Sequence, residues 1–392
     1  MRLLFVADGR SPIARSWIEY FLREPYQVHL VSTRSCAKLP GLASLEILPL
    51  WPGGGGAGVA RRQRNLALAT LLRHWLGPWI VSRRGPRLRG LLRERAPDLV
   101  HALRVPFEGM LAAAAQPAMP LAISTWGNDL TLHAPASPMM RWSTRRALRR
   151  AAGLHADCQR DVALAARWGF RSPRPTLVVP GNGGVRKEFF FPGPRPGDPD
   201  FAIDRRAPVV VQPRGLRAYV CSDTFFRAIP LIRRERPEAV FVCPAMEGAA
   251  EAEGWRARLG LGASLRLLPP LDPASMGALF RRAAISVSPS LHDGTPNTLL
   301  EAMACGSFPV AGDLPSIREW IEDGVNGLLI DPSDESSLAA AVLRGLADDE
   351  WRARAAQLNG RAVDERAEYK HGMAQAASFY ARVLRGEGLD AL

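Results

Sequence analysis

The chain has 392 residues, which exceeds the usual size of a single hydrophobic core and predicts two domains. Its net charge of +13 comes almost entirely from arginine, because the sequence holds only three lysines. A basic surface favours an anionic partner such as a nucleotide or a lipid phosphate. The five cysteines are scattered without Cys-x-x-Cys or Cys/His spacing, which argues against a disulfide framework or zinc site and favours a reducing, cytoplasmic compartment.

No segment has the pattern of a targeting or membrane-spanning sequence. The apolar run at the N-terminus reaches Asp8 too soon for a signal peptide. The most apolar long stretch, residues 65–82, contains Arg73, His74 and Pro78 and falls short of a membrane span.

Apolar runs bounded by turn residues predict the strands of a first domain at residues 2–7, 27–32, 45–50, 98–103, 121–125 and 176–180. Helical patterns lie between them, beginning with residues 14–24. Strands that alternate with helices predict a parallel sheet in a doubly wound α/β fold.

The chain from residue 180 to 200 is dense in glycine and proline and predicts an inter-domain linker. A second set of strands is expected at residues 208–213, 239–244, 265–270, 284–289, 307–312 and 327–332. We therefore expect two Rossmann-like domains facing a central cleft. The N-terminal domain is expected at residues 1–185, a linker at 186–207 and the C-terminal domain at 208–365. The remaining residues, 366–392, are expected to form a helix, around 374–384, that crosses back to the first domain.

Residues 292–306, HDGTPNTLLEAMACG, place two acids eight positions apart around a Gly-Thr-Pro turn. Thr295 is the expected N-cap of a helix with Pro296 at its first position. The unpaired N–H groups of a helix N-terminus favour an anion, so the stretch predicts a phosphate cradle with Asp293 and Glu301 on either side. The alternative is a capped helix with two solvated acids.

The run from residue 289 to 342 closely resembles the C-terminal half of retaining glycosyltransferases of family 4, which have the GT-B fold. It carries the two acids, a Gly-x-Pro between them, EAMACG-x-PV and then NG-x-L, although the first acid is Asp293 where the family usually has Glu. Residues 124–130, STWGNDL, resemble the Trp-Gly-Ser/Asn-Asp loop of one branch of that family. Residues 178–184, VVPGNGG, resemble its Pro-Asn-Gly segment before the linker.

The resemblance implies transfer of a sugar from a nucleoside diphosphate sugar, UDP or GDP most of all, to an acceptor hydroxyl with retention of configuration. Asp293 would contact the sugar, and Glu301 would hold the ribose. The helix N-terminus would take the diphosphate, with these residues lining it: Gly294, Thr295, Asn297, Thr298 and Leu299. The leaving diphosphate would accept the acceptor's proton, so neither a cofactor nor a metal is implied. The Asp-x-Asp at residues 198–200 lies in the linker and is not expected to bind metal.

Two positions depart from the family pattern. Its members usually clamp the diphosphate with an Arg and, five or six residues later, a Lys. Here Arg214 is present, but Tyr219 stands five residues on. Arg217 is then the candidate second cation, and the alternative is a solvated arginine.

In the first domain, Trp126 stands where the family often has a His that contacts the sugar. Asp129 is the candidate that replaces it in the cleft, and the alternative is a loop-capping aspartate. Gly9, in the turn after the first strand, would permit close approach of the backbone to the donor.

Ten arginines lie between residues 61 and 95 against one acid, Glu94, and they are interleaved with Leu and Trp. Residues 139–150 are similar. This pattern predicts docking on an anionic membrane, and the resemblance adds a lipid-linked or cell-envelope glycan as acceptor. The alternative is a solvated Arg-rich face, and no nucleic-acid-binding motif is present. Two rival functions stay open, a non-catalytic sugar-nucleotide-binding module and a GT-B nucleotide-sugar epimerase.

Overall fold

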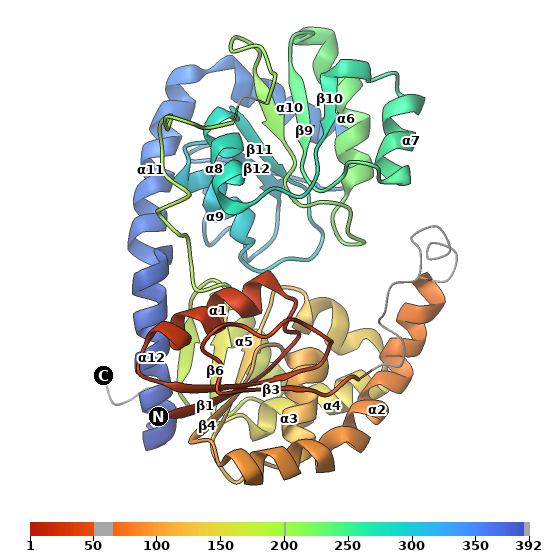
Figure 1. Cartoon of the computed structure of the whole chain (residues 1–392). Coiled ribbons are helices and arrows are strands. Elements are labelled where there is room, and N and C mark those ends of the chain that lie inside the picture. The colour runs from red at the N-terminus through yellow and green to blue at the C-terminus, as the bar shows by residue number, and fades with distance from the viewer. Residues whose placement is uncertain (51–65, 200, 388–392) are drawn as a thin grey trace. The chain divides into compact units, whose positions relative to one another are not determined.

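The computed structural model describes residues 1–50, 66–199 and 201–387, and the chain divides into two compact units (Figure 1). The first unit is Met1–Gly183 together with the C-terminal residues from Lys370, and the second is Gly184–Tyr369. Residues 53–56 are four consecutive glycines, which predict a surface loop, and they lie outside the described residues. So do three of the ten N-domain arginines, Arg61, Arg62 and Arg64.

The first unit is built on a seven-stranded parallel sheet with the order β3-β2-β1-β4-β5-β6-β7. Its strands are β1 (Arg2–Ala7), β2 (Gln27–Ser32), β3 (Ser44–Ile47), β4 (Leu99–Ala102), β5 (Leu121–Thr125), β6 (Gly153–Ala156) and β7 (Thr176–Val178). Three expected strands have the predicted bounds, and the other three are shorter. The sequence reasoning missed β6, because its residues Gly-Leu-His-Ala carry little strand propensity.

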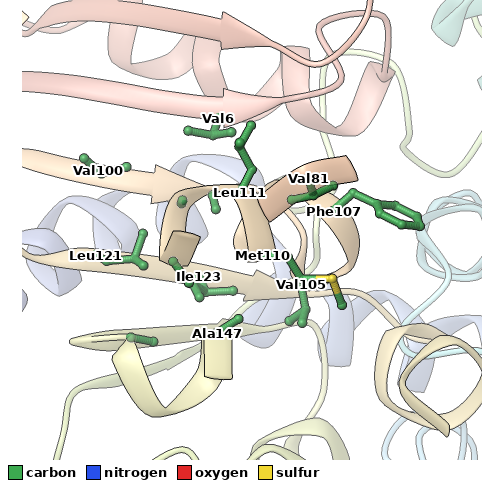
Figure 2. Packing of buried hydrophobic residues seen from close by; sticks show 14 of the residues in the cluster. Val6, Val81, Val100, Val105, Phe107, Met110, Leu111, Leu121, Ile123 and Ala147 are labelled. Atoms are coloured by element: carbon green, nitrogen blue, oxygen red, sulfur yellow. The ribbon is translucent and has the colours of Figure 1, made fainter. Parts of the chain in front are cut away.

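Helices surround this sheet: α1 (Pro12–Arg23), α2 (Leu66–Arg95), α3 (Met110–Ala115), α4 (Pro138–Arg150), α5 (Gln159–Trp168) and α12 (Tyr369–Arg385). One part of the core packs α2, α3 and α4 against apolar residues of the central strands. Figure 2 shows this cluster, with Val6 and Val100 of the sheet near Leu111 of α3.

The C-terminal helix α12 packs within the first unit through a buried chain of hydrogen bonds. The Tyr380 hydroxyl accepts from Trp17 Nε1 at 2.8 Å and lies 2.6 Å from His101 Nδ1. The chain continues through Ser124 to His155, whose Nε2 lies 3.0 Å from the Val179 carbonyl oxygen. Because these polar groups satisfy one another, they can be buried without the cost of unpaired donors or acceptors.

The second unit has a six-stranded parallel sheet with the order β10-β9-β8-β11-β12-β13. Its strands are β8 (Val209–Val211), β9 (Val240–Cys243), β10 (Leu265–Leu267), β11 (Ile285–Ser288), β12 (Phe308–Gly312) and β13 (Leu328–Ile330). Its helices are α6 (Ser222–Glu235), α7 (Ala250–Arg258), α8 (Pro273–Arg282), α9 (Asn297–Ala304), α10 (Glu335–Ala347) and α11 (Asp349–Ala367). All six expected strands exist, each shorter than the apolar run that predicted it.

Both faces of the second sheet are covered, which explains the unbroken apolar runs of its strands. Val210 joins a core with α6, α7 and α10, whereas Val209 and Val211 join a core with α8, α9 and α11. Successive side chains of a strand point to opposite faces, so three adjacent valines serve two cores.

Each sheet reverses its strand order at one place, between β1 and β4 in the first unit and between β8 and β11 in the second. In open α/β sheets, ligands bind outside the carboxyl ends of the strands at this topological switch point. In the second unit, the loops that follow β8 and β11 are tied together there. Cys221 N donates to the Pro289 carbonyl at 2.8 Å, and Leu291 N donates to the Tyr219 carbonyl at 2.9 Å.

Candidate active site

Arg214 and Asp293 meet at the switch point of the second unit. Arg214 lies in the loop after β8, and its terminal nitrogen donates to Asp293 Oδ2 at 2.7 Å. The loop is held by Gln212, whose side chain accepts from Arg214 N and donates to Ser222 Oγ, both at 3.1 Å. Both members of the ion pair are buried. An arginine held this way keeps a fixed positive charge at the carboxyl edge of the sheet.

Several buried polar atoms at this edge have no hydrogen-bond partner among the described residues: Arg214 Nε, Ser288 Oγ, Ser290 Oγ and Thr298 Oγ1. Arg214 follows β8, and Ser288 ends β11. Ser290 lies just after β11, and Thr298 is in the first turn of α9. Unpartnered buried donors and acceptors are costly, and sites that bind polar ligands commonly hold them. Ser288 and Ser290 were not predicted, although their position at the end of a strand was the available signal.

Helix α9 begins one residue later than expected. Pro296 is the N-cap, with an extended backbone (φ −65°, ψ 123°), and Asn297 is the first helical residue. The prediction of Thr295 as the N-cap was wrong, because its buried hydroxyl accepts instead from Trp320 Nε1 at 3.1 Å. Among the described residues, no side chain forms a capping hydrogen bond with this helix. Gly294, beside it, donates its N–H to Asp293 Oδ1 at 3.2 Å.

The first amides of α9 differ in what they can offer to a ligand. Leu299 N donates to the Pro296 carbonyl at 3.0 Å, and the Leu299 side chain is buried in the core. Within the described residues, the N–H groups of Asn297 and Thr298 have no such bond. The N–H groups of Asn297 and Thr298 can therefore donate to a ligand, whereas the N–H of Leu299 is already bonded to Pro296.

Glu301 lies further along α9, within the electrostatic field of Arg214. Burial raises the pKa of Glu301 from 4.5 to about 7, and the charge of Arg214 opposes this rise. This carboxyl group therefore holds its proton to a higher pH than an exposed glutamate does. Arg217, by contrast, is exposed and donates to the Tyr219 hydroxyl at 3.1 Å. The structure thus brings together Arg214, Asp293, Glu301 and the start of α9, with Arg217 on the surface of the same loop.

Asp129 belongs to the first unit and is completely buried. It accepts from Arg104 Nε at 2.8 Å, from Trp126 N at 3.1 Å and from Val105 N at 3.4 Å. Burial raises the pKa of Asp129, while the charge of Arg104 opposes the rise. These contacts make Asp129 a positioning residue for the loop from Trp126 onward.

Gly9 is held inside the first unit by close neighbours. Its N–H donates to Ser32 Oγ at 3.0 Å, and a Cβ at this position would lie 2.5 Å from Cys36 Sγ. Packing against Cys36 is therefore enough to require a glycine here.

One cluster with metal-ligand chemistry occurs among the described residues and was not predicted. Ligand atoms of Asp157, Cys158 and Asp161 lie within 4.8 Å of one another. Asp161 pairs with Arg160 at 2.6 Å, and Asp157 accepts from Gly127 N at 3.1 Å. These partners already supply positive charge and N–H groups to the carboxylates.

No helix in the described ranges combines the length and the apolar character needed to span a bilayer.

Comparison with known proteins places both units. Residues 9–183 match the family model of the glycosyl transferase 4-like domain, and residues 215–348 match that of glycosyl transferases group 1. Among curated proteins, the chain is 30% identical over 186 residues to the D-inositol 3-phosphate glycosyltransferase of Geodermatophilus obscurus, an alignment that covers 45% of this chain and 41% of that protein.

Solved structures are similar over nearly the full length. Sucrose-phosphate synthase from Thermosynechococcus elongatus has a TM-score of 0.76 at 15% identity, covering 99% of this chain and 100% of that one. Anabaena HepE in complex with UDP-glucose has a TM-score of 0.73 at 18% identity, covering 97% and 99%. Residues 9–183 and 215–348 thus each match a glycosyl transferase family model, and the chain has the GT-B fold.

Proposed function

We propose that the protein is a retaining glycosyltransferase of family 4 that moves a sugar from a nucleoside diphosphate sugar to an acceptor hydroxyl. The observation that carries the proposal is the buried Arg214–Asp293 pair at the switch point, with Glu301 in the field of the same arginine. The similarity to a UDP-glucose complex of HepE supports a nucleotide sugar as donor. The alignment with the curated relative spans less than half of that relative's length. The activity is therefore proposed from the residues of the site and not from the relative's name.

Each residue at the site has a chemical role in this proposal. Asp293 accepts hydrogen bonds from sugar hydroxyls, and Glu301 accepts from the ribose. Arg214 and the amides of Asn297 and Thr298 bind the diphosphate, whose negative charge suits a guanidinium and a helix N-terminus. Arg217 is the candidate second cation.

The transfer step needs no further group from the protein. The bond from the anomeric carbon to the diphosphate oxygen breaks, and a bond to the acceptor oxygen forms on the same face of the sugar. The acceptor's proton passes to the leaving diphosphate, whose growing charge Arg214 and the amides of α9 stabilise. These fixed positive groups supply the charge stabilisation that a metal ion provides elsewhere, and we propose a metal-independent reaction.

We also propose roles for the parts of the chain. Residues 208–365 would bind the donor, residues 1–185 would bind the acceptor, residues 186–207 would link them, and the helix in 366–392 would complete the first domain. Asp129 would act by positioning its loop.

A screen of UDP, GDP, ADP and their common sugar conjugates by thermal shift and calorimetry tests the donor site. We expect one nucleoside diphosphate to raise the melting temperature, since a ligand that binds the native state stabilises it by mass action. Glu301→Ala should abolish that shift, and Glu319→Ala, in the same unit, should leave it unchanged. If no nucleotide binds, the proposal fails. If one does, NMR of the product's anomeric proton tests whether the configuration of the sugar is retained.

We further propose that the acceptor is a lipid-linked or cell-envelope glycan and that the protein binds peripherally to the inner face of the cell membrane. Four large apolar residues of α2 are exposed with helical spacing: Leu72, Trp75, Leu76 and Trp79. Residues at this spacing share one face of a helix, and Arg83 stacks over Trp79 at 3.9 Å. An amphipathic face that combines Trp and Leu with Arg suits an anionic membrane interface.

Helix α4 adds a second basic surface with the exposed Trp142. An open groove of about 580 Å³ is lined by Pro138, Arg141, Trp142, Arg145, Arg146, Arg149 and Arg150. Flotation with phosphatidylglycerol vesicles tests the surface. Trp75→Ala/Trp79→Ala should reduce binding at least several-fold, whereas Trp255→Ala in the second unit should not. If the parent protein fails to bind these vesicles at moderate salt, the membrane proposal is wrong.

A further inference from the structure

The first unit gathers arginines at its own switch point, between β1 and β4. Arg34 follows β2, Arg104 follows β4, and Arg10 lies in the turn after β1. Arg73 of α2 joins them, with its guanidinium carbon 4.5 Å from the centre of the Phe107 ring. Partial burial lowers the pKa of Arg73, and repulsion from Arg104 and Arg34 lowers it further, while Glu108 and Asp8 oppose this. The group is therefore close enough to interact electrostatically.

The acids near these arginines are already committed. Asp8 binds Arg10 through two hydrogen bonds, at 3.0 and 2.8 Å. Asp129 binds Arg104 at 2.8 Å. Glu108 is buried and accepts from Thr33 Oγ1 at 2.7 Å, and burial raises its pKa.

Two of these guanidinium groups, those of Arg34 and Arg73, are not held by a direct contact with a carboxylate in the described residues. In the part of the chain that the structure describes, neither Arg34 nor Arg73 forms an ion pair or a side-chain hydrogen bond to a carboxylate. Like charges brought close repel one another, so an anion that enters between these guanidinium groups would be attracted by both. Arg34 and Arg104 follow β2 and β4, the strands on either side of β1 at the switch point, where α/β folds bind ligands.

We propose that Arg34 and Arg73, with Arg104 beside them, bind a phosphate group carried by the acceptor. This inference rests on the proposed function, because it names a chemical property of the acceptor. Arginine suits the task, since its planar fork matches the oxygens of a phosphate. The aromatic ring of Phe107 holds Arg73 in place, and Asp129 and Asn128 hold Arg104.

Titration of the full-length protein with inorganic phosphate, followed by ³¹P NMR line broadening, tests the subsite. We expect two classes of site, one in each unit. Arg34→Ala and Arg73→Ala should each weaken one class about tenfold, and Arg214→Ala should remove the other. Arg84→Ala, an exposed arginine on the same helix as Arg73, is the matched control and should change neither class.

The outcomes separate the two proposals. If Arg34→Ala/Arg73→Ala leaves phosphate binding intact while Arg214→Ala abolishes it, the acceptor subsite is wrong and the donor site stands. If no nucleoside diphosphate binds but the double variant still loses a phosphate site, the proposed function fails and the anion site stands.

Two further probes identify the source of the phosphate. Glycerol 3-phosphate in solution should bind to the parent but not to the double variant if the acceptor is a small phosphate ester. Undecaprenyl phosphate in nonionic micelles should show that dependence instead if the phosphate belongs to a lipid carrier. Equal binding of glycerol and glycerol 3-phosphate would overturn the requirement for phosphate.

Discussion

Arg214 and Asp293 lie 79 residues apart in the sequence, yet their side chains form a 2.7 Å ion pair whose members are only 8% and 12% exposed. The pair joins the loop after β8 to the loop after β11. Removing one member leaves the other as a buried charge without a partner, which typically costs about 3–5 kcal/mol.

Arg214→Ala should therefore lower the free energy of unfolding by an amount of this order, measured by urea denaturation. The double variant Arg214→Ala/Asp293→Ala should lose less than the sum of the two single variants, since it leaves neither charge unpaired. The exposed pair Arg318–Asp313 provides the control, and Arg318→Ala should change the unfolding midpoint little. Strict additivity at Arg214 and Asp293 would contradict the coupling.

Glu301 should make donor binding depend on pH. Its pKa is raised by burial to about 7, and the carboxylate is the form that accepts hydrogen bonds from ribose hydroxyls. As the pH falls below 7, the proton competes with the ligand, and affinity should fall toward a limit of about tenfold per pH unit. Calorimetry with the preferred nucleoside diphosphate at pH 5.5 to 8.5 measures this. Glu301→Gln should bind more weakly at pH 8 and lose the dependence, and an unchanged profile would reject the assignment.

The same group should affect stability with the opposite trend. Between pH 4.5 and 7 the folded protein keeps a proton on Glu301 that the unfolded chain releases, so this group's contribution to stability falls as the pH rises. The free energy of unfolding of Glu301→Gln, relative to the parent, should therefore increase from pH 4.5 to pH 7. Chemical denaturation at several pH values checks the sign.

Tyr380 should hold α12 in the first unit. Tyr380→Phe removes the hydroxyl that accepts from Trp17 and contacts His101, which leaves buried polar groups unpaired at about 1–3 kcal/mol each. We expect a lower free energy of unfolding and faster hydrogen exchange of α12 amides. Tyr369→Phe, at the start of the same helix, is the comparison. Equal exchange in the two variants would argue against the network.

The two histidines of this network should destabilise the first unit in acid. Burial holds the pKa of His101 well below 6.5 and lowers that of His155 to about 4. Between pH 6.5 and about 4 the unfolded chain therefore takes up protons that the folded protein refuses, and stability should fall as the pH falls. His155→Gln should show a shallower loss over this window, measured by thermal unfolding.

Gly153 should be required for the docking of α12 on β6. A Cβ there would lie 2.4 Å from Val383 and 2.8 Å from Phe379, and overpacking of this kind costs about 1–3 kcal/mol. Gly153→Ala should lower the melting temperature. Gly90→Ala in α2, where no atom lies within 4 Å, should instead be neutral or stabilising by up to about 1 kcal/mol. If both variants behave alike, the contact with α12 is not limiting.

Local pattern alone determined the alternation of strands and helices in both units and the two-domain class. It also located Asp293 and the helix that carries Glu301, because strand, turn and helix follow one another within twenty residues. It missed β6, whose four residues have weak strand propensity and are held by neighbours on both sides, β5 and β7. It also misplaced the N-cap of α9, because the Thr295 hydroxyl bonds to Trp320, 25 residues away.

Only the tertiary structure decided which charged groups meet. The sequence contains 51 lysine and arginine residues. No local pattern distinguishes Arg214, which is buried against Asp293, from Arg217, which is exposed three residues later in the same loop. The same holds for Arg34 and Arg73, which come from a strand end and a helix and share one end of the first sheet. Strand order determines these encounters, and it depends on the packing of whole elements around a core, since the free energy of burial is spread over contacts between residues distant in the chain.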